Sequence, residues 1–203
     1  MPPAPSFIPL SSAEQIDILE PVEKEQRFLR PIVIDGTNVA LEHGKHKNTF
    51  SCRGLKIAID YFLQKGHENV TAFVPLHRLE RKNYYPFATD HFLLEELEKL
   101  GRVVCTPSRI VNDRRVTCYE GRFIVDLATL TGGVIVSNDK YRDLVEESEA
   151  YKKTIEKRLL IFCFDGDDFL IPKDPLGVNG PGVDEFLSMS ATEKNLFSSA
   201  QPQ

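Results

Sequence analysis

The stretch PIVIDGTN, residues 31–38, decides how this chain folds. Its β-branched run is typical of a strand that is buried on both faces of a parallel sheet. The run ends at Asp35, and the carboxyl end of a strand is the edge at which open α/β sheets bind ligands. A second run, GVIVSND at 133–139, repeats the pattern and ends at Asp139. We therefore expect the two aspartates to converge at one sheet edge, where a divalent cation would balance their charge.

The remaining elements predict an α/β fold built as a right-handed βαβ series. Further strands are predicted at 70–74, 103–105, 160–164 and 169–171. Ser51 is a predicted N-cap, and helices are expected at 52–65, 90–100, 123–131, 141–144 and 151–159. Polar or basic loops are predicted at 43–49, 76–87 and 109–115.

Length and composition predict one domain with flanking segments. The 203 residues are 41% hydrophobic, which suffices for a single buried core. Residues 1–26 are predicted to be a flexible leader, 27–188 the domain, and 189–203 a disordered tail. No apolar run reaches about 18 residues, and the N-terminus lacks a secretory signal, so no membrane association is expected. The scattered cysteines lack metal-type spacing and indicate reduced, intracellular thiols.

Carboxylates carry the predicted chemistry. Asp143 lies four residues after Asp139 and shares a helical face with it if that segment is helical, and Glu120 opens the helix before the 134–137 strand. Oxygen-rich clusters suit Mg²⁺ or Mn²⁺, which activate water and stabilise the leaving oxygen of a phosphodiester. Asn38, three residues past Asp35, is placed to orient a ligand or a water. The alternative is structural, because a strand-end aspartate often only forms a turn or caps a helix.

Two basic segments are candidate RNA-contacting surfaces, although charged loops are also common as plain solvated surface. Their cations would bind a phosphate backbone, and the tyrosines of the first segment would stack on bases. The cations are Arg78, Arg81, Lys82, Arg109, Arg114 and Arg115. His43 and His46 lack a third zinc ligand, and neither a Walker A motif nor GxGxxG occurs.

Six ordered motifs across 28–187 resemble the NYN/PIN-like domain of the Regnase family of ribonucleases. They are LRPIVIDGTNVALEHG, FSCRGLKIAIDYFLQKGHENVTAFVP, TPSR, CYEGRFIVDLA, GGVIVSNDKYRDL and DPLGVNGPGVDEFL. The resemblance implies a PIN-like three-layer α/β/α sandwich with a central, mostly parallel sheet. It implies an endoribonuclease that uses Mg²⁺, or Mn²⁺ in its place, on single-stranded or stem-loop RNA in mRNA decay or RNA silencing. Its catalytic residues would be Asp35, Asn38, Glu120, Asp139 and Asp143, all but Asn38 being metal ligands. Arg122 joins the basic residues as a predicted RNA contact.

One motif departs from the family pattern. The family usually carries two adjacent aspartates in a CYDDRF stretch, whereas this chain reads CYEGRF at 118–123. Glu120 lengthens the first acid and Gly121 removes the second, so weaker Mg²⁺ binding is expected. A second hypothesis follows: a catalytically weakened or inactive protein that binds RNA or pairs with an active paralogue as a scaffold.

The resemblance also sets expectations about partners and place. No CCCH zinc finger is evident, because the four cysteines lack its spacing. A homodimer, or a heterodimer with a related NYN protein, is expected, with RNA rather than DNA as the substrate. The expected location is the cytoplasm, including RNA granules, with a nuclear fraction left open.

Overall fold

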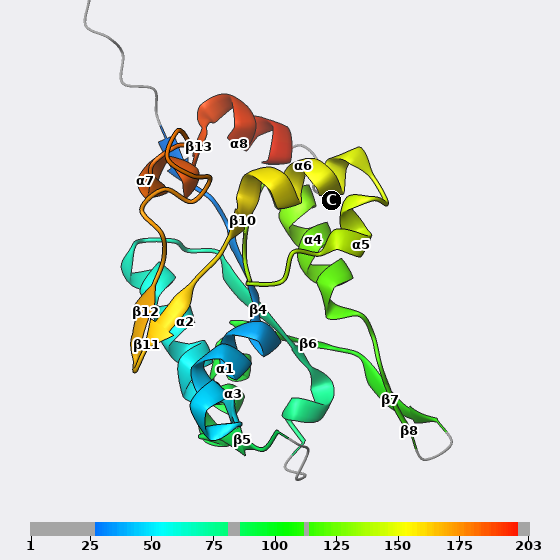
Figure 1. The fold of residues 1–203 in the computed structure, drawn as a ribbon. Coiled ribbons are helices and arrows are strands. Elements are labelled where there is room, and N and C mark those ends of the chain that lie inside the picture. The colour runs from blue at the N-terminus through cyan, green and yellow to red at the C-terminus, as the bar shows by residue number, and fades with distance from the viewer. Residues whose placement is uncertain (1–26, 81–85, 112–113, 199–203) are drawn as a thin grey trace, which may run out of the picture.

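A parallel sheet forms the centre of the molecule (Figure 1), which we describe from a computed structural model at residues 27–80, 86–111 and 114–198. All its neighbouring strands run parallel. Its five strands are, in order, β10 (Leu159–Leu160), β9 (Val134–Val136), β2 (Ile32–Asp35), β4 (Val70–Pro75) and β6 (Val103–Thr106). The chain extends the sheet from β2 through β4 to β6 and then returns to β9 and β10 on the other side. The border between β2 and β9 is therefore the switch point at which such sheets bind ligands.

Helices cover both faces of the sheet, as the two groups of helices in Figure 1 show. One layer holds α1 (Gly36–Gly44), α2 (Cys52–Gln64) and α3 (His91–Lys99). The other holds α4 (Glu120–Thr131), α5 (Arg142–Val145) and α6 (Glu149–Arg158). In β2, Ile32 and Ile34 pack into the core under the first layer, and Val33 packs into the core under the second. The predicted three-layer α/β architecture is thus confirmed, and the β-branched run is explained by burial on both sides.

Short elements complete the described chain. They include the 3-10 helices η1 (Lys45–Lys47) and η2 (Leu76–Arg78) and the helices α7 (Val183–Phe186) and α8 (Ala191–Ser198). Antiparallel pairs join β1 (Arg27–Leu29) to β13 (Ser188–Ser190), β7 (Ser108–Val111) to β8 (Arg114–Thr117), and β11 (Cys163–Asp165) to β12 (Asp168–Leu170). The strands β3 (Phe50–Ser51) and β5 (Ala88–Thr89) pair in parallel. No helix in these described ranges is long and apolar enough to cross a membrane.

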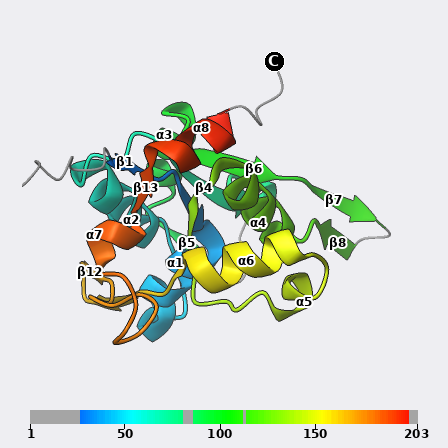
Figure 2. The ribbon, with the colours of Figure 1, turned by 90° about the horizontal axis from the view of Figure 1, so that it is seen from above.

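Three predicted segments differ from the structure. Within the basic segment 109–115, residues 109–111 and 114–115 lie in the strands of the β7–β8 hairpin rather than in a loop, and this hairpin extends away from the body (Figure 2). The predicted strand 160–164 is divided, because β10 ends at Leu160 and β11 begins a separate hairpin at Cys163. Helix α1 continues through His43 to Gly44, where the predicted polar loop was to begin. Backbone hydrogen bonds, which local polarity does not report, set these boundaries: β7 pairs with β8, β11 pairs with β12, and the Lys45 N–H donates to the Glu42 carbonyl at the end of α1.

The predicted disordered tail is also corrected for residues 189–198. These residues form β13 and α8, and Met189 is buried. Glu193 accepts two hydrogen bonds from the Arg30 guanidinium, at 2.8 and 2.9 Å. The contacts that order this segment come from the other end of the chain, so its polar composition hides them. The predicted leader, residues 1–26, and the last residues, 199–203, lie outside the described residues.

Candidate active site

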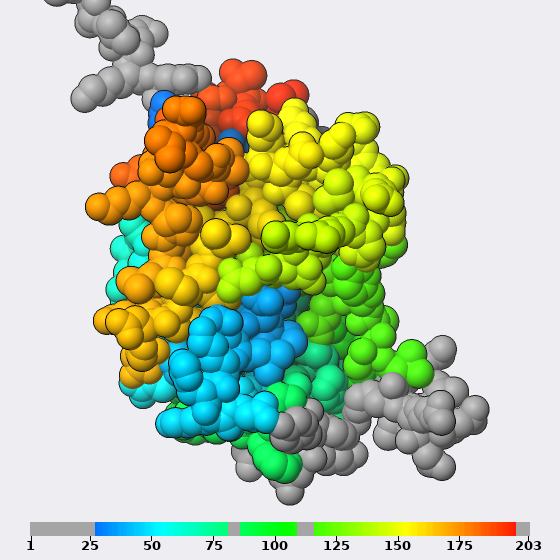
Figure 3. All heavy atoms as spheres, in the orientation of Figure 1, coloured from blue at the N-terminus to red at the C-terminus, as the bar shows by residue number. Residues whose placement is uncertain are grey.

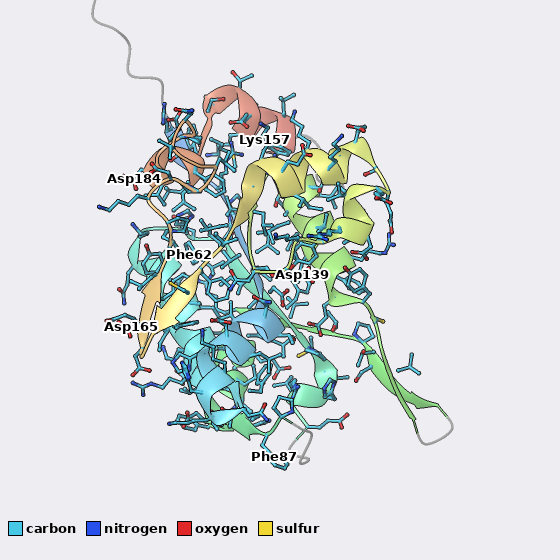
Figure 4. All side chains as sticks on the ribbon, viewed as in Figure 1. Phe62, Phe87, Asp139, Lys157, Asp165 and Asp184 are labelled. Atoms are coloured by element: carbon cyan, nitrogen blue, oxygen red, sulfur yellow. The ribbon has the colours of Figure 1, made fainter. Side chains whose placement is uncertain are left out.

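Four acidic side chains come from the ends of elements around the β2–β9 border. Asp35 ends β2, Asp139 follows β9, and Glu120 and Asp143 lie in the first turns of α4 and α5. Figure 4 shows Asp139 between α1 and α4. On the surface, the blue residues of α1 border the yellow-green segment that follows β9 (Figure 3). The structure therefore brings the predicted acids to one edge of the sheet.

Asp35 is both a helix cap and a buried acid. Its Oδ1 accepts a hydrogen bond from the Asn38 backbone N–H at 2.9 Å, which caps α1. Its Oδ2 accepts hydrogen bonds from the Ser137 and Tyr141 hydroxyls, at 3.0 and 2.9 Å. The residue is only 8% exposed, and this burial raises the pKa of the carboxyl, with a smaller contribution from the Asp139 charge. Asp35 therefore does cap a helix, as the structural alternative predicts. Its carboxyl is also buried, and a nearby cation would stabilise the ionised form that burial disfavours.

Glu120 is a second acid of the site with a raised pKa. Its Oε2 accepts a hydrogen bond from the Thr37 hydroxyl at 2.8 Å. Burial raises the pKa of the Glu120 carboxyl to about 7, and the nearby Asp35 charge adds to the effect. A carboxyl with this pKa both holds and releases a proton near neutral pH, which suits a general acid or base.

Asp139 is held by its own loop. Its Oδ1 accepts a hydrogen bond from the Tyr141 backbone N–H at 3.0 Å, and its N–H donates to the Ser137 hydroxyl at 3.0 Å. Tyr141 has a positive φ of 45°, a conformation that costs free energy for a residue with a side chain. Its buried hydroxyl on Asp35 and its N–H on Asp139 stabilise that conformation, so the loop geometry is tied to both acids.

Asp143 and Asn38 complete the predicted set. Asp143 Oδ1 accepts a hydrogen bond from the Tyr119 hydroxyl at 3.0 Å. Burial, with the Asp143 hydrogen bond second, raises the pKa of Tyr119 to about 12, so this phenol stays a donor at neutral pH. Asn38 Oδ1 accepts from the Asn138 backbone N–H at 3.0 Å, which joins the first turn of α1 to the loop after β9. The role of Asn38 toward a ligand or water stays a prediction.

The sequence analysis missed the hydroxyl donors of the site. Each predicted acid except Asp139 receives a side-chain hydroxyl hydrogen bond, from the residues Thr37, Tyr119, Ser137 and Tyr141. The sequence held a signal for all four hydroxyl residues, because each lies within two residues of a predicted acid in the chain. Their pairing across the sheet edge was not readable, since Thr37 and Glu120 are far apart in sequence.

Two of the predicted RNA contacts, Arg78 and Arg122, have partners within the protein. Arg78 is buried, donates from Nη1 to the Pro86 carbonyl at 2.7 Å, and lies 4.6 Å from the Phe50 ring centroid. Its desolvation lowers the pKa of the guanidinium. Arg122 donates two hydrogen bonds to the Glu147 carboxylate, at 2.7 and 2.6 Å. Arg78 is thus buried within the fold rather than exposed on a loop, whereas the Arg122 side chain is about half exposed and its contact with RNA stays a prediction.

The other basic candidates are distributed over two places. Arg109, Arg114 and Arg115 lie in the β7–β8 hairpin, which leads through Cys118 and Tyr119 directly into α4 and Glu120. Arg81 and Lys82 lie outside the described residues. The hairpin is therefore the predicted basic segment that leads directly into the helix carrying Glu120.

The acids fit a hydrated cation rather than a closed metal cage. Among the described residues, no three His, Cys, Asp or Glu side chains converge tightly enough to hold a metal ion between them. Mg²⁺, however, is commonly bound through one or two carboxylates and keeps several waters. The donor set here is entirely oxygen, and burial raises the pKa values of Asp35 and Glu120, as expected of acids that lack a neutralising partner. These residues therefore fit Mg²⁺ or Mn²⁺ with much of its water shell retained.

Comparison with known proteins identifies the family. Residues 28–185 match the family described as the Zc3h12a-like ribonuclease NYN domain, which confirms the Regnase resemblance. The chain is 47% identical over 160 residues to endoribonuclease rege-1 of Caenorhabditis elegans. That match covers 79% of this chain and 25% of the relative, so the chain spans about a quarter of the relative's length. The chain belongs to the Zc3h12a-like ribonuclease NYN family.

Solved structures of lower sequence identity share the fold. Two structures of the protein-only RNase P 2 of Arabidopsis thaliana match with TM-scores of 0.52 and 0.54, each at 18% identity. They cover 73% and 81% of this chain, and 31% and 32% of the plant protein. At this identity the match shows the PIN-like α/β fold alone.

Proposed function

We propose, from the premise of a Zc3h12a-like ribonuclease NYN domain, that this protein is a metal-dependent endoribonuclease. The proposed substrate is single-stranded or stem-loop RNA, and the proposed cofactor is Mg²⁺, or Mn²⁺ in its place. The observation that supports this most is the pair Asp35 and Glu120, whose carboxyls burial holds at raised pKa values beside Asp139. Uncompensated acids at the switch point of a parallel sheet are what a cation-dependent site requires.

The side chains present divide the work of the reaction. Asp35, Glu120, Asp139 and Asp143 would hold the cation, which when bound supplies positive charge to the phosphodiester and acidifies a bound water. Glu120, which accepts a hydrogen bond from the Thr37 hydroxyl, would bind the cation as a carboxylate, because a nearby positive charge favours the ionised form. The Ser137 and Tyr141 hydroxyls fix the orientation of Asp35 before any substrate arrives, which removes reorganisation from the reaction.

The RNA would approach along the β7–β8 hairpin. Three arginines belong to this hairpin, and its second strand connects to the first turn of α4, where Glu120 lies. Cations on an extended hairpin bind the phosphate backbone without reading sequence. RNA specificity would then come from the shape of the loop or from a partner, including a second NYN domain.

The proposal is tested by cleavage of a labelled stem-loop RNA with the full chain. We expect cleavage with Mg²⁺ or Mn²⁺, none with chelator, and none with Asp35→Asn in either metal. The matched control is Asp184→Asn, an exposed aspartate on α7 that Figure 4 places far from Asp139. Cleavage that persists in Asp35→Asn would assign the activity to a contaminant and reject the proposal.

A second function is favoured by one observation, the absence of a side chain at Gly121. With one acid fewer than the usual family motif, the site would bind its cation more weakly, and the domain would serve as an RNA-binding or pairing scaffold. In that case RNA binding would be retained without cleavage, and Asp35→Asn would leave the binding unchanged. The same set of variants therefore separates the two functions.

A further inference from the structure

The ring of Tyr119 occupies space that only a glycine at position 121 leaves open. An ideal Cβ built on Gly121 would lie 2.8 Å from Cζ of Tyr119 and 2.9 Å from its Cε2 and Oη atoms. Cβ contacts shorter than 3.0 Å are essentially never seen in proteins, so any side chain at 121 would displace the ring. Tyr119 precedes α4 and Gly121 lies in its first turn, so the ring folds back over the start of its own helix.

The hydroxyl of this ring reaches a different element. It donates to Asp143 Oδ1 at 3.0 Å, across 24 residues of sequence. Asp143 lies on α5, a helix of only four residues, and is exposed. An exposed carboxylate on one helical turn has considerable rotamer freedom. The hydrogen bond from Tyr119, the residue that precedes α4, reduces that freedom.

We propose that Tyr119 is a positioning residue that fixes the Asp143 carboxylate, and that Gly121 is required because its missing side chain lets the Tyr119 ring reach that place. The inference rests on the proposed metal-dependent function and adds to it a residue that does not itself contact the cation. Because the Tyr119 hydroxyl donates to Oδ1 of Asp143, the other carboxylate oxygen would remain available to a cation. Gly121 thus removes one acid of the family motif, and it also makes room for the Tyr119 hydroxyl to hold Asp143 in place.

Two substitutions remove this hydrogen bond in different ways. Tyr119→Phe removes the hydroxyl and keeps the ring. Gly121→Ala keeps the hydroxyl and displaces the ring, and alanine is a better helix residue than glycine, so the fold should not be weakened. Groups that orient metal ligands typically change metal affinity by 10- to 100-fold when they are lost. Because both substitutions break one interaction, their effects should not multiply.

The experiment measures Mn²⁺ binding to the full chain by electron paramagnetic resonance of free Mn²⁺. We expect Tyr119→Phe and Gly121→Ala each to weaken binding about tenfold, and the double variant to be no weaker than either. The matched control is Tyr61→Phe, because Tyr61 packs on Phe62 and Phe169 in the α2 region and should not affect binding. Urea unfolding checks that all variants retain the stability of the wild type.

The outcomes separate this inference from the proposed function. Wild-type Mn²⁺ affinity in Tyr119→Phe, or effects that multiply in the double variant, would overturn the positioning role even if RNA is cleaved. Absence of Mn²⁺ binding in the wild type would also overturn it. If the wild type binds Mn²⁺ with the expected pattern of variants but cleaves no RNA, the positioning role stands and the proposed nuclease activity fails.

Discussion

Glu120 makes the stability of the metal-free protein depend on pH. Burial raises the pKa of its carboxyl from the ordinary 4.5 to about 7. Between those values the folded protein keeps a proton that the unfolded chain has released, so the free energy of unfolding falls as the pH rises. The difference between the two pKa values corresponds to a loss of at most about 3 kcal/mol in the free energy of unfolding. Because Glu120 is only partly buried, solvent screening reduces the expected loss to about 1–2 kcal/mol.

The assay compares the wild type with Glu120→Gln by urea unfolding in chelator, from about pH 5 to about pH 8. Glutamine keeps an oxygen for the Thr37 hydroxyl but does not titrate. We expect the stability of the wild type relative to this variant to fall by about 1–2 kcal/mol across the range. Glu156→Gln, an exposed position on α6, is the control and should follow the wild type at every pH.

Excess Mg²⁺ provides the link to function. A cation beside Glu120 favours the carboxylate and lowers its pKa, so the loss of stability at higher pH should disappear. A difference between wild type and Glu120→Gln that stays constant with pH would refute the burial argument. If the stability difference between the wild type and Glu120→Gln varies with pH but does not change when Mg²⁺ is added, the cation is not bound near Glu120.

Three further substitutions test the contacts around the site and the C-terminal segment. Ser137→Ala removes a donor to Asp35 and should lower RNA cleavage about 10- to 100-fold in a kinetic assay, and because the buried hydroxyl also accepts the Asp139 N–H, urea unfolding should show a loss of about 1–3 kcal/mol. Gly36→Ala would place a Cβ 2.5 Å from a carbonyl oxygen of β4, so urea unfolding should show a loss of about 1–3 kcal/mol. Glu193→Ala leaves the largely buried Arg30 guanidinium without its bidentate partner and should lower the free energy of unfolding by about 1–2 kcal/mol, whereas Glu193→Gln should lose less.

The sheet and its acidic edge could be predicted because their signals are local. The β-branched run that ends at Asp35 predicts a buried strand and the position of its end, and β2 is found at Ile32–Asp35. Ser51 was a correct N-cap prediction, since its hydroxyl accepts from the Gly54 N–H at 3.2 Å. Such short-range patterns depend on backbone geometry within a few residues, which the order of amino acids reports directly.

Other features depend on contacts that no local pattern encodes. A cation is normally exposed, so nothing in the basic segment 76–87 indicated that Arg78 would be buried against Phe50. Residues 189–198 read as polar, and they are ordered by a strand and an arginine from the opposite end of the chain. The position of Tyr119 depends on the space above Gly121 and on its hydrogen bond to Asp143, and no sequence pattern reports either contact.

The way the acids are held explains how the site can be ordered and still attract a cation. Asp35, Glu120 and Asp143 each accept a hydrogen bond from a neutral hydroxyl, and no arginine or lysine in the described part of the chain donates to them. An ion pair would position a carboxylate equally well, but it would also neutralise the charge that binds a metal. A hydroxyl supplies a direction and leaves the negative charge in place. Arg122 has instead an ion pair with Glu147, and Arg78 is buried near Glu120, where its charge only partly offsets the rise in the Glu120 pKa. The hydroxyls therefore fix three of the acids without neutralising them, as the proposed cation site requires.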